Sequence, residues 1–213
     1  VRLKRYRNGS LQKTTSITLV YDLLTGKAHY NIINEITAEL ANYKFNLYGV
    51  KGKSEYLIKT VNNVVAGDAY IIQGQSNAVA NLRGVFSTAN NADDASNAPN
   101  RNYVRVYGNG SATSAYTHGW FIGRGNSYYD TDGQTGQWGM RMGSNLAGAK
   151  RIPIAIFNGA SPGQHIAYFS RNDALPTDPT TNYGRLLKRI TDAGFKNNIR
   201  GVIWHQEIGR AHV

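Results

Sequence analysis

The 213-residue chain contains no cysteine, two methionines and five prolines. Without cysteine it can form neither a disulfide framework nor a thiolate metal site. No apolar run approaches the length of a membrane-spanning helix. Hydrophobic residues make up 41% of the chain and charged residues 17%, which is enough apolar material for a core. The sequence therefore predicts a folded chain with one large domain or two small ones.

Acidic residues are also scarce, and the formal net charge is +11 at pH 7. The basic excess is spread over both halves of the chain, and no nucleic-acid-binding motif accompanies it. A nucleic-acid-binding domain usually gathers its cations on one face. We therefore expect solvated surface cations and no nucleic-acid partner, with attraction to acidic glycans as the weaker alternative.

The first part of the chain alternates apolar and polar side chains as short β-strands do. Asn8-Gly9 is a strong hairpin signal. Strand patterns recur at regular spacing, at residues 17–21, 30–32, 43–48 and 56–58. This spacing predicts a partial antiparallel β-sandwich module of immunoglobulin-like type over residues 1–64. The segment 36–42 fits either this β pattern or a helical turn.

From residue 65 the pattern changes to buried strands that alternate with helices. Strands are expected at residues 69–73, 103–107, 152–157 and 199–205, and the last one is expected to be buried, as are those at 69–73 and 152–157. Two helices are expected: one at 138–146 with Trp138, Met142 and Leu146 on one stripe, and one at 182–194 with Asn182 as its N-cap. Strand–helix alternation predicts a parallel sheet with helices on both faces, spanning residues 65–206.

Three of these strands end in segments that can carry chemistry. The strand at 69–73 leads to Gly74 and then Ser76, the strand at 152–157 leads to the loop 158–163, and the last strand leads to His205-Gln206. Parallel strands place their carboxyl ends on one edge of the sheet. Backbone N–H groups of Ser76 and Gly163, with the amide of Gln206, are therefore candidate donors to an oxyanion.

These segments resemble the ordered sequence blocks of one enzyme family, the sialate O-acetylesterase-like branch of the SGNH hydrolases. The blocks are Gly74-Gln75-Ser76-Asn77, then Asn158-Gly159-Ala160 followed by Gly163, then Val202-Ile203-Trp204-His205-Gln206. The resemblance covers about residues 64–206. It implies a flavodoxin-like α/β fold and a serine carbohydrate O-acetylesterase that acts on sialic acid or plant-type polysaccharides without a cofactor.

The resemblance also assigns roles to single residues. Ser76 matches the nucleophile, and Gly163 and Gln206 match the other two oxyanion donors. Asn77 matches a residue that fixes the turn. Four residues are candidates for contact with an acetylated sugar or polysaccharide substrate: Asn77, Asn158, Gln164 and His165. Family members are typically exported, so we expect a secreted or cell-surface protein.

The chain departs from the family pattern in two places. The segment Ser161-Pro162-Gly163-Gln164 stands where the family has paired glycines and a threonine. The family's catalytic Asp-x-x-His lies downstream of the third block, after the last residue of this chain. We expect a fragment that is itself inactive, from a parent protein that is an esterase, because a serine without a general base is a poor nucleophile. Residues 207–213 are expected to be a non-native, adapter-coded tail.

The sequence also fits a second function and a second role for its aromatic residues. The alternative function is a non-catalytic glycan-binding or adhesive protein on a hydrolase scaffold, since a fold does not fix a function. Aromatic side chains at positions 120, 121, 128 and 129 fit either a sugar-stacking rim or ordinary packing. No histidine pair has the i, i+4 spacing of a zinc site, so we expect no metal.

Overall fold

The computed structural model describes residues 1–80, 98–111, 113–125 and 130–206. The chain divides into two compact units, with the boundary between Ala66 and Gly67. None of the helices in the described ranges is long and apolar enough to span a membrane. The sequence prediction for residues 207–213 lies outside the described residues, as do Tyr128 and Tyr129.

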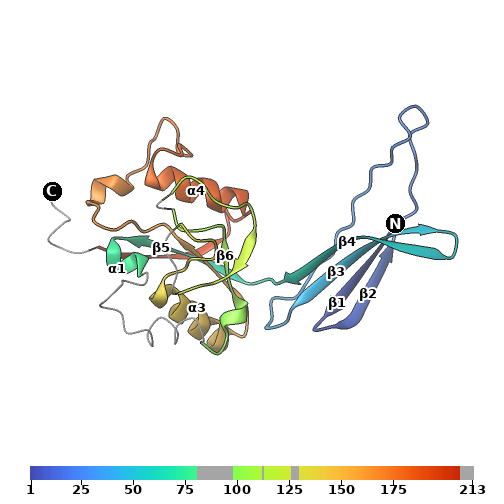
Figure 1. Cartoon of the computed structure of the whole chain (residues 1–213), viewed down its shortest axis with the longest axis horizontal. Helices are drawn as coiled ribbons and strands as arrows, with labels where there is room; N and C mark the ends of the chain where they lie inside the picture. The colour runs from blue at the N-terminus through green and yellow to red at the C-terminus, as the bar shows by residue number, and fades with distance from the viewer. Residues whose placement is uncertain (81–97, 112, 126–129, 207–213) are drawn as a thin grey trace. The chain divides into compact units, whose positions relative to one another are not determined.

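The first unit is a four-stranded antiparallel sheet with the order β2-β1-β3-β4 (Figure 1). Its strands are β1 (Arg2–Arg7), β2 (Ser10–Ser16), β3 (Tyr43–Lys51) and β4 (Ser54–Val64). Asn8 and Gly9 connect β1 to β2 with φ angles of 46° and 87°. Positive φ at both positions is the geometry of a type I′ hairpin, so the hairpin predicted at Asn8-Gly9 is confirmed.

The described residues 1–66 form this one antiparallel sheet, so the partial β-sandwich module of immunoglobulin-like type stays a prediction. No strand forms at 17–21 or 30–32, and no helix forms at 36–42. The segment 17–42 is instead a long loop with a turn at its tip, where Gly26 N–H donates to Asp22 O at 2.9 Å. Alternation alone does not make a strand, since a strand also needs a pairing partner. Leu23 is 98% exposed in this loop.

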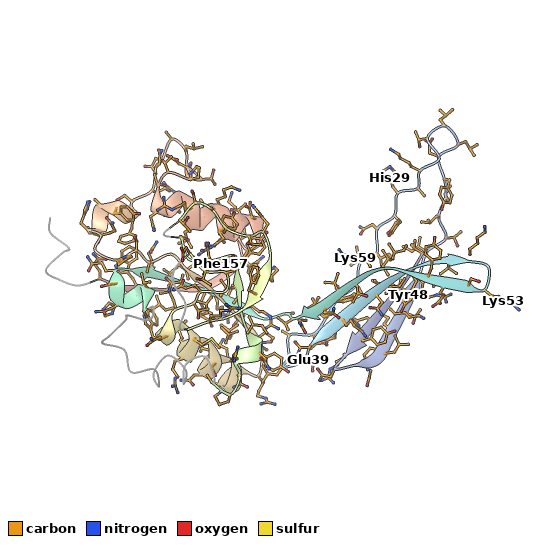
Figure 2. All side chains as sticks on the ribbon, viewed as in Figure 1. His29, Glu39, Tyr48, Lys53, Lys59 and Phe157 are labelled. Carbon is orange, nitrogen blue, oxygen red and sulfur yellow. The ribbon has the colours of Figure 1, made fainter. Side chains whose placement is uncertain are left out.

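Part of this loop is held against the sheet by polar contacts. Glu39 accepts hydrogen bonds from the Arg7 guanidinium at 2.7 and 2.5 Å and from the Tyr43 hydroxyl at 2.6 Å. These contacts lower the pKa of Glu39 to about 2, chiefly through the bonds from Arg7 and then Tyr43. Figure 2 labels Glu39 on the first unit. The contacts tie the end of the loop to β1 and to the start of β3.

The second unit is a five-stranded mixed sheet with the order β7-β6-β8-β5-β9 (Figure 1). Four strands are parallel: β5 (Asp68–Gly74), β6 (Val104–Tyr107), β8 (Ile154–Asn158) and β9 (Ile199–His205). The fifth, β7 (Trp120–Ile122), runs antiparallel to β6 at one edge. The strands predicted at 69–73, 103–107 and 152–157 are therefore confirmed, each within two residues.

The strand order differs from the flavodoxin-like order that the family resemblance implies. In that order the first strand lies between the second and the third. Here β5, the first parallel strand, lies between β8 and β9, and β6 pairs with β8. Hydrophobic runs predict the strands but carry no information on which strand pairs with which. The unit is a mixed α/β fold with its own strand order.

Helices cover both faces of this sheet, as predicted. On one face, α4 (Asn182–Asp192) packs Leu186 and Ile190 against Ala155 and Phe157. On the other face, α3 (Gln137–Lys150) lies against the alternate strand residues Ile72, Val104 and Ile156. Figure 1 shows the two helices on opposite sides of the sheet, and Figure 2 labels Phe157 in the interior. The sheet is thus the middle layer of three.

The face that α3 buries is not the one predicted. Trp138, Met142 and Leu146 are half-buried, whereas the buried residues are Gly139, Met140, Gly143, Ser144 and Ala147. The small residues let the helix axis approach the sheet closely. A Cβ on Gly139 would lie 2.8 Å from Ile72 Cδ1. A hydrophobicity pattern finds large apolar side chains and so misses a face made of small ones.

Two further predictions need correction. The N-cap of α4 is Thr181, whose hydroxyl accepts from Gly184 N–H at 3.0 Å, so Asn182 is the first helical residue. The strand β9 is not fully buried, because Val202 is 61% and Trp204 45% exposed. β9 is an edge strand of the described sheet, and one of its faces is mostly uncovered.

Candidate active site

The carboxyl ends of β5, β8 and β9 meet at one edge of the sheet. Residue register places Ile72 beside Asn158 and Gly74 beside His205. The segments that follow these positions begin at neighbouring points of the same edge. The sequence blocks that contain Ser76, Gly163 and Gln206 are therefore brought together by the fold.

The turn after β5 requires glycine at position 74. Gly74 has a φ of 130°, and a Cβ there would lie 1.8 Å from the carbonyl oxygen of His205. Its own carbonyl accepts from Ser161 N–H at 3.0 Å, and Gln75 N–H donates to His205 O at 3.1 Å. The backbone at this turn is thus bonded to the loop after β8 and to the end of β9. A side chain would break this close approach.

Ser76 begins the short helix α1 (Ser76–Val79) directly after this turn. N–H groups in the first turn of a helix have no partner within the helix. Ser76 is half-buried, and among the residues that the structure describes its hydroxyl has no hydrogen-bond partner. The residue therefore offers both a hydroxyl and a free backbone N–H at the sheet edge.

A single carbonyl connects the three segments. The side-chain amides of Gln75 and Gln206 both donate to the carbonyl oxygen of Gln164, the latter at 3.3 Å. Gln75 directly precedes Ser76, and Gln164 directly follows Gly163. The orientation of both amides is fixed by this contact, because an amide oxygen in place of the nitrogen would face the carbonyl oxygen. The Gln206 amide thus presents its nitrogen to the loop that contains Gly163.

Gly163 lies in an exposed loop with a φ of 74°. Within the described ranges its N–H has no backbone acceptor. Together with Ser76 N–H and the second N–H of the Gln206 amide, it is available to an external acceptor. Fixed donors of this kind are what an oxyanion hole needs, because they are oriented before charge develops on the substrate oxygen.

Asn158, predicted as a substrate contact, is 1% exposed and bonded on all sides. Its amide nitrogen donates to Ala78 O at 3.1 Å and to Thr135 O at 2.9 Å, while its Oδ1 accepts from Ala160 N–H at 3.0 Å. No polar atom of its side chain is exposed to a substrate. Asn158 instead holds α1 and the loop after β8 in place.

The other predicted contacts lie nearer the surface. Asn77 and His165 are exposed and Gln164 is half-buried. The backbone carbonyl of Asn77 accepts from Trp138 Nε1 at 2.6 Å, which ties α1 to α3. His165 precedes the 3₁₀ turn η3 (Ile166–Phe169), beside the segment that contains Gly163. These three residues surround the edge at which Ser76 lies.

A buried amide network supports the turn, and the sequence patterns did not identify it. Gln73 Nε2 donates to Asn182 Oδ1 at 3.0 Å, and Gln73 Oε1 accepts from Gly74 N–H at 3.2 Å. Asn182 Nδ2 in turn donates to Gly159 O at 2.9 Å. The network links α4 to the ends of β5 and β8. Its signal in the sequence was a glutamine inside an apolar strand.

Trp120, predicted as part of a sugar-stacking rim, packs edge-on against Phe157 and Phe195 at centroid distances of 6.1 and 5.5 Å. It belongs to β7, at the opposite edge strand from β9. In the described part of the chain no group of three or more acidic, histidine or cysteine side chains is arranged to hold a metal ion.

A surface depression of about 530 Å³ lies elsewhere, beside Asp68 and Arg200 at the amino ends of β5 and β9. The candidate nucleophile lies at the other end of the same strands. We therefore assign the candidate active site to the carboxyl edge, where the hydroxyl and the three donors are.

No protein-family model matches the chain, and no curated protein matches it in sequence. Among solved structures it is similar to a carbohydrate acetylesterase from Xanthomonas citri, with 17% identity and a TM-score of 0.44 over 97% of this chain. It is also similar to a protein from Arabidopsis thaliana, with 17% identity and a TM-score of 0.41 over 65% of this chain. The chain spans 44% and 56% of the lengths of those two proteins. Fold and site define a mixed α/β protein with a serine at a strand-to-helix turn.

Proposed function

We propose that the chain carries the nucleophile and the oxyanion donors of a serine esterase that removes O-acetyl groups from carbohydrates. The observation that carries this proposal is the pair of hydrogen bonds from Gln75 and Gln206 to Gln164 O. These bonds bring the segments of Ser76, Gly163 and Gln206 to one place. O-acetylated sialic acid is the narrower substrate candidate, because the sequence blocks resemble those of sialate O-acetylesterases.

The reaction runs in two steps. Ser76 Oγ attacks the acetyl carbonyl carbon, its proton passes to a general base, and the carbonyl electron pair moves onto oxygen. The resulting oxyanion accepts from Ser76 N–H, Gly163 N–H and the Gln206 amide. Collapse expels the sugar alkoxide, which takes the proton and leaves an acetyl group on Ser76. Water then attacks the acetyl-serine by the same route and releases acetate.

A second function is favoured by one specific observation. Among the described residues the Ser76 hydroxyl has no basic partner, so its activation depends on a group outside them. In the family that the sequence resembles, this group is the histidine of an Asp-x-x-His segment. A protein without that histidine binds acetylated glycans at the same edge and does not hydrolyse them.

Covalent labelling tests the proposal. A fluorophosphonate forms a bond from serine Oγ to phosphorus and loses fluoride, with its phosphoryl oxygen in the position of the oxyanion. We expect slow labelling of the chain at Ser76, located by peptide mapping, because oxyanion donors alone retain part of an esterase's rate advantage, roughly 10³-fold. Ser76→Ala abolishes it. Ser161→Ala is the matched control, since Ser161 lies at the same edge but is 5% exposed. Labelling at another serine, or at none, contradicts the proposal.

A further inference from the structure

Arg189 is the largest fully buried side chain of the described protein, with 1% of its surface exposed. Buried arginines are normally paired with a carboxylate. In the part of the chain that the structure describes, no carboxylate pairs with this one. Burial lowers the pKa of Arg189 to about 9, so the guanidinium is still charged at neutral pH. The protein therefore buries a charged side chain at a position where an apolar side chain of similar volume usually gives a fold of equal or greater stability.

The guanidinium makes one hydrogen bond among the described residues. Arg189 Nη2 donates to the carbonyl oxygen of Asn158 at 2.9 Å, while its Nε and Nη1 have no partner there. The same carbonyl accepts from Ser111 N–H at 3.1 Å. A hydrogen bond from a charged donor is stronger than one between neutral groups. Arg189 therefore fixes the backbone of Asn158, the last residue of β8.

Asn158 transmits this restraint to the candidate site. Its side chain donates to Ala78 O in α1 and to Thr135 O, and it accepts from Ala160 N–H at the start of the loop that leads to Gly163. Ala78 is two residues from Ser76. A shift of the Asn158 backbone would therefore move both the nucleophile's helix and the loop with the second oxyanion donor.

We propose that Arg189 is a positioning residue for the Ser76 site, acting through Asn158. The role in catalysis rests on the esterase function proposed above, whereas the mechanical link from Arg189 to α1 does not. The residue touches neither substrate nor Ser76. It holds the residue that joins β8, α1 and the loop after β8.

Two measurements on the whole chain test this proposal: the rate of fluorophosphonate labelling at Ser76, and hydrogen exchange of the α1 amides. Arg189→Met removes the donor with little change in volume. We expect Ser76 labelling to slow at least tenfold. Exchange at Ala78, Val79 and Ala80 should speed up at least tenfold while Ile156 in β8 stays protected. Arg189→Lys replaces the guanidinium with a charged ammonium group that can still donate to Asn158 O, and it should recover most of both losses.

Ile190→Ala is the control, since Ile190 is 3% exposed on the same helix and lies next to Arg189. It weakens the core but should leave the labelling rate and the relative exchange of α1 unchanged. Equal effects from Ile190→Ala, or wild-type behaviour of Arg189→Met, overturn the proposal. If Arg189→Met does not fold, Arg189→Gln is compared with Arg189→Lys by the same criteria.

The two proposals fail in different ways. Faster α1 exchange in Arg189→Met, with no labelling of wild-type Ser76, supports the mechanical link and contradicts the esterase function. Labelling of wild-type Ser76 that is unaffected in every Arg189 variant supports the esterase function and contradicts the role of Arg189.

Discussion

The side-chain amides of Gln75 and Gln206 donate to one carbonyl oxygen, that of Gln164. The two glutamines lie at the ends of adjacent parallel strands, and the carbonyl belongs to the loop after a third strand. The two hydrogen bonds therefore form only when the segments after β5, β8 and β9 lie next to one another. Gln75 Oε1 and Gln206 Oε1 are buried and have no partner among the described residues, so the amide nitrogens alone carry this contact.

Gln206→Glu should damage the site more than the fold. A carboxylate cannot donate to Gln164 O and would repel it, and the oxyanion would lose one donor. We expect fluorophosphonate labelling of Ser76 to slow by about 100-fold, the usual effect of removing one donor. The measurement is the labelling rate at saturating reagent. Gln12→Glu, on an exposed strand position of the first unit, should leave it unchanged. An unchanged rate in Gln206→Glu would remove Gln206 from the donor set.

Gly74→Ala should destabilise the second unit by about 3 kcal/mol or more, since it combines backbone strain with a steric conflict. The new Cβ would lie 1.8 Å from His205 O at a φ of 130°. Urea unfolding followed by tryptophan fluorescence measures the effect, because all three tryptophans lie after residue 66. Gly194→Ala is the matched control, with a φ of 80° and nothing within 4 Å of its Cβ. It should cost only about 1 kcal/mol, for the left-handed conformation. Equal losses in both variants would show that the approach of His205 is not tight.

The amide network of Gln73 and Asn182 should behave as one unit. Asn182→Ala leaves the buried Gln73 amide without its acceptor, which costs about 1–3 kcal/mol. Gln73→Leu leaves Asn182 Oδ1 without its donor at a similar cost. The double variant removes both ends of the Gln73–Asn182 hydrogen bond, so neither side-chain amide is left orphaned by the loss of the other. The sum of the two single losses should therefore clearly exceed the loss measured for the double variant. A double-mutant cycle by urea unfolding checks this coupling. Strict additivity would mean that the two amides do not depend on each other.

The stability of the first unit should fall in acid because of Glu39. Its pKa is about 2 in the folded chain, lowered by Arg7 and Tyr43, against an ordinary value of 4.5. A carboxyl whose pKa is lowered by folding stabilises the protein above its unfolded pKa, and this contribution is lost as the pH falls toward the folded value. We expect the protection of β1 and β3 amides to decrease between pH 4.5 and pH 2. Hydrogen exchange followed by NMR measures it.

Glu39→Gln is the variant that isolates this effect. It removes the titrating group, so β1 and β3 should lose less protection across the same pH interval than they do in the wild type. Glu35→Gln is the matched control, because the side chain of Glu35 has no ion pair among the described residues. A wild-type pH profile in Glu39→Gln would contradict the assignment.

The buried strands and their carboxyl edge were predictable from sequence, because the apolar runs at 69–72 in β5 and 154–157 in β8 lead into glycine-containing turns. Gly74 and Gln75-Ser76 were placed at the turn for this reason. The strand order was not predictable, since apolar runs do not encode which strands pair. The first unit shows the same limit: Ile17 to Tyr21 alternate well, yet the pairing with the start of the chain ends at Ile17, which exchanges backbone hydrogen bonds with Val1, and residues 18–21 pair with none of the described strands.

The hydrophobic pattern did not identify the residues that support the site, because each is polar at a position where that pattern predicts an apolar residue. Gln73 interrupts an apolar strand, and Arg189 lies among the buried residues of α4 between Leu186 and Ile190. A polar side chain on a predicted core face was the signal available. What it bonds to depends on tertiary contacts, such as Arg189 with Asn158 O, that a linear pattern does not contain.

The most direct test is a crystal structure of the chain with a phosphonate on Ser76. The account predicts a phosphoryl oxygen within about 2.7–3.1 Å of Ser76 N, Gly163 N and Gln206 Nε2 together, as an oxyanion hole requires. A phosphoryl oxygen that points to solvent, or a Gln206 amide turned away from it, would contradict the account.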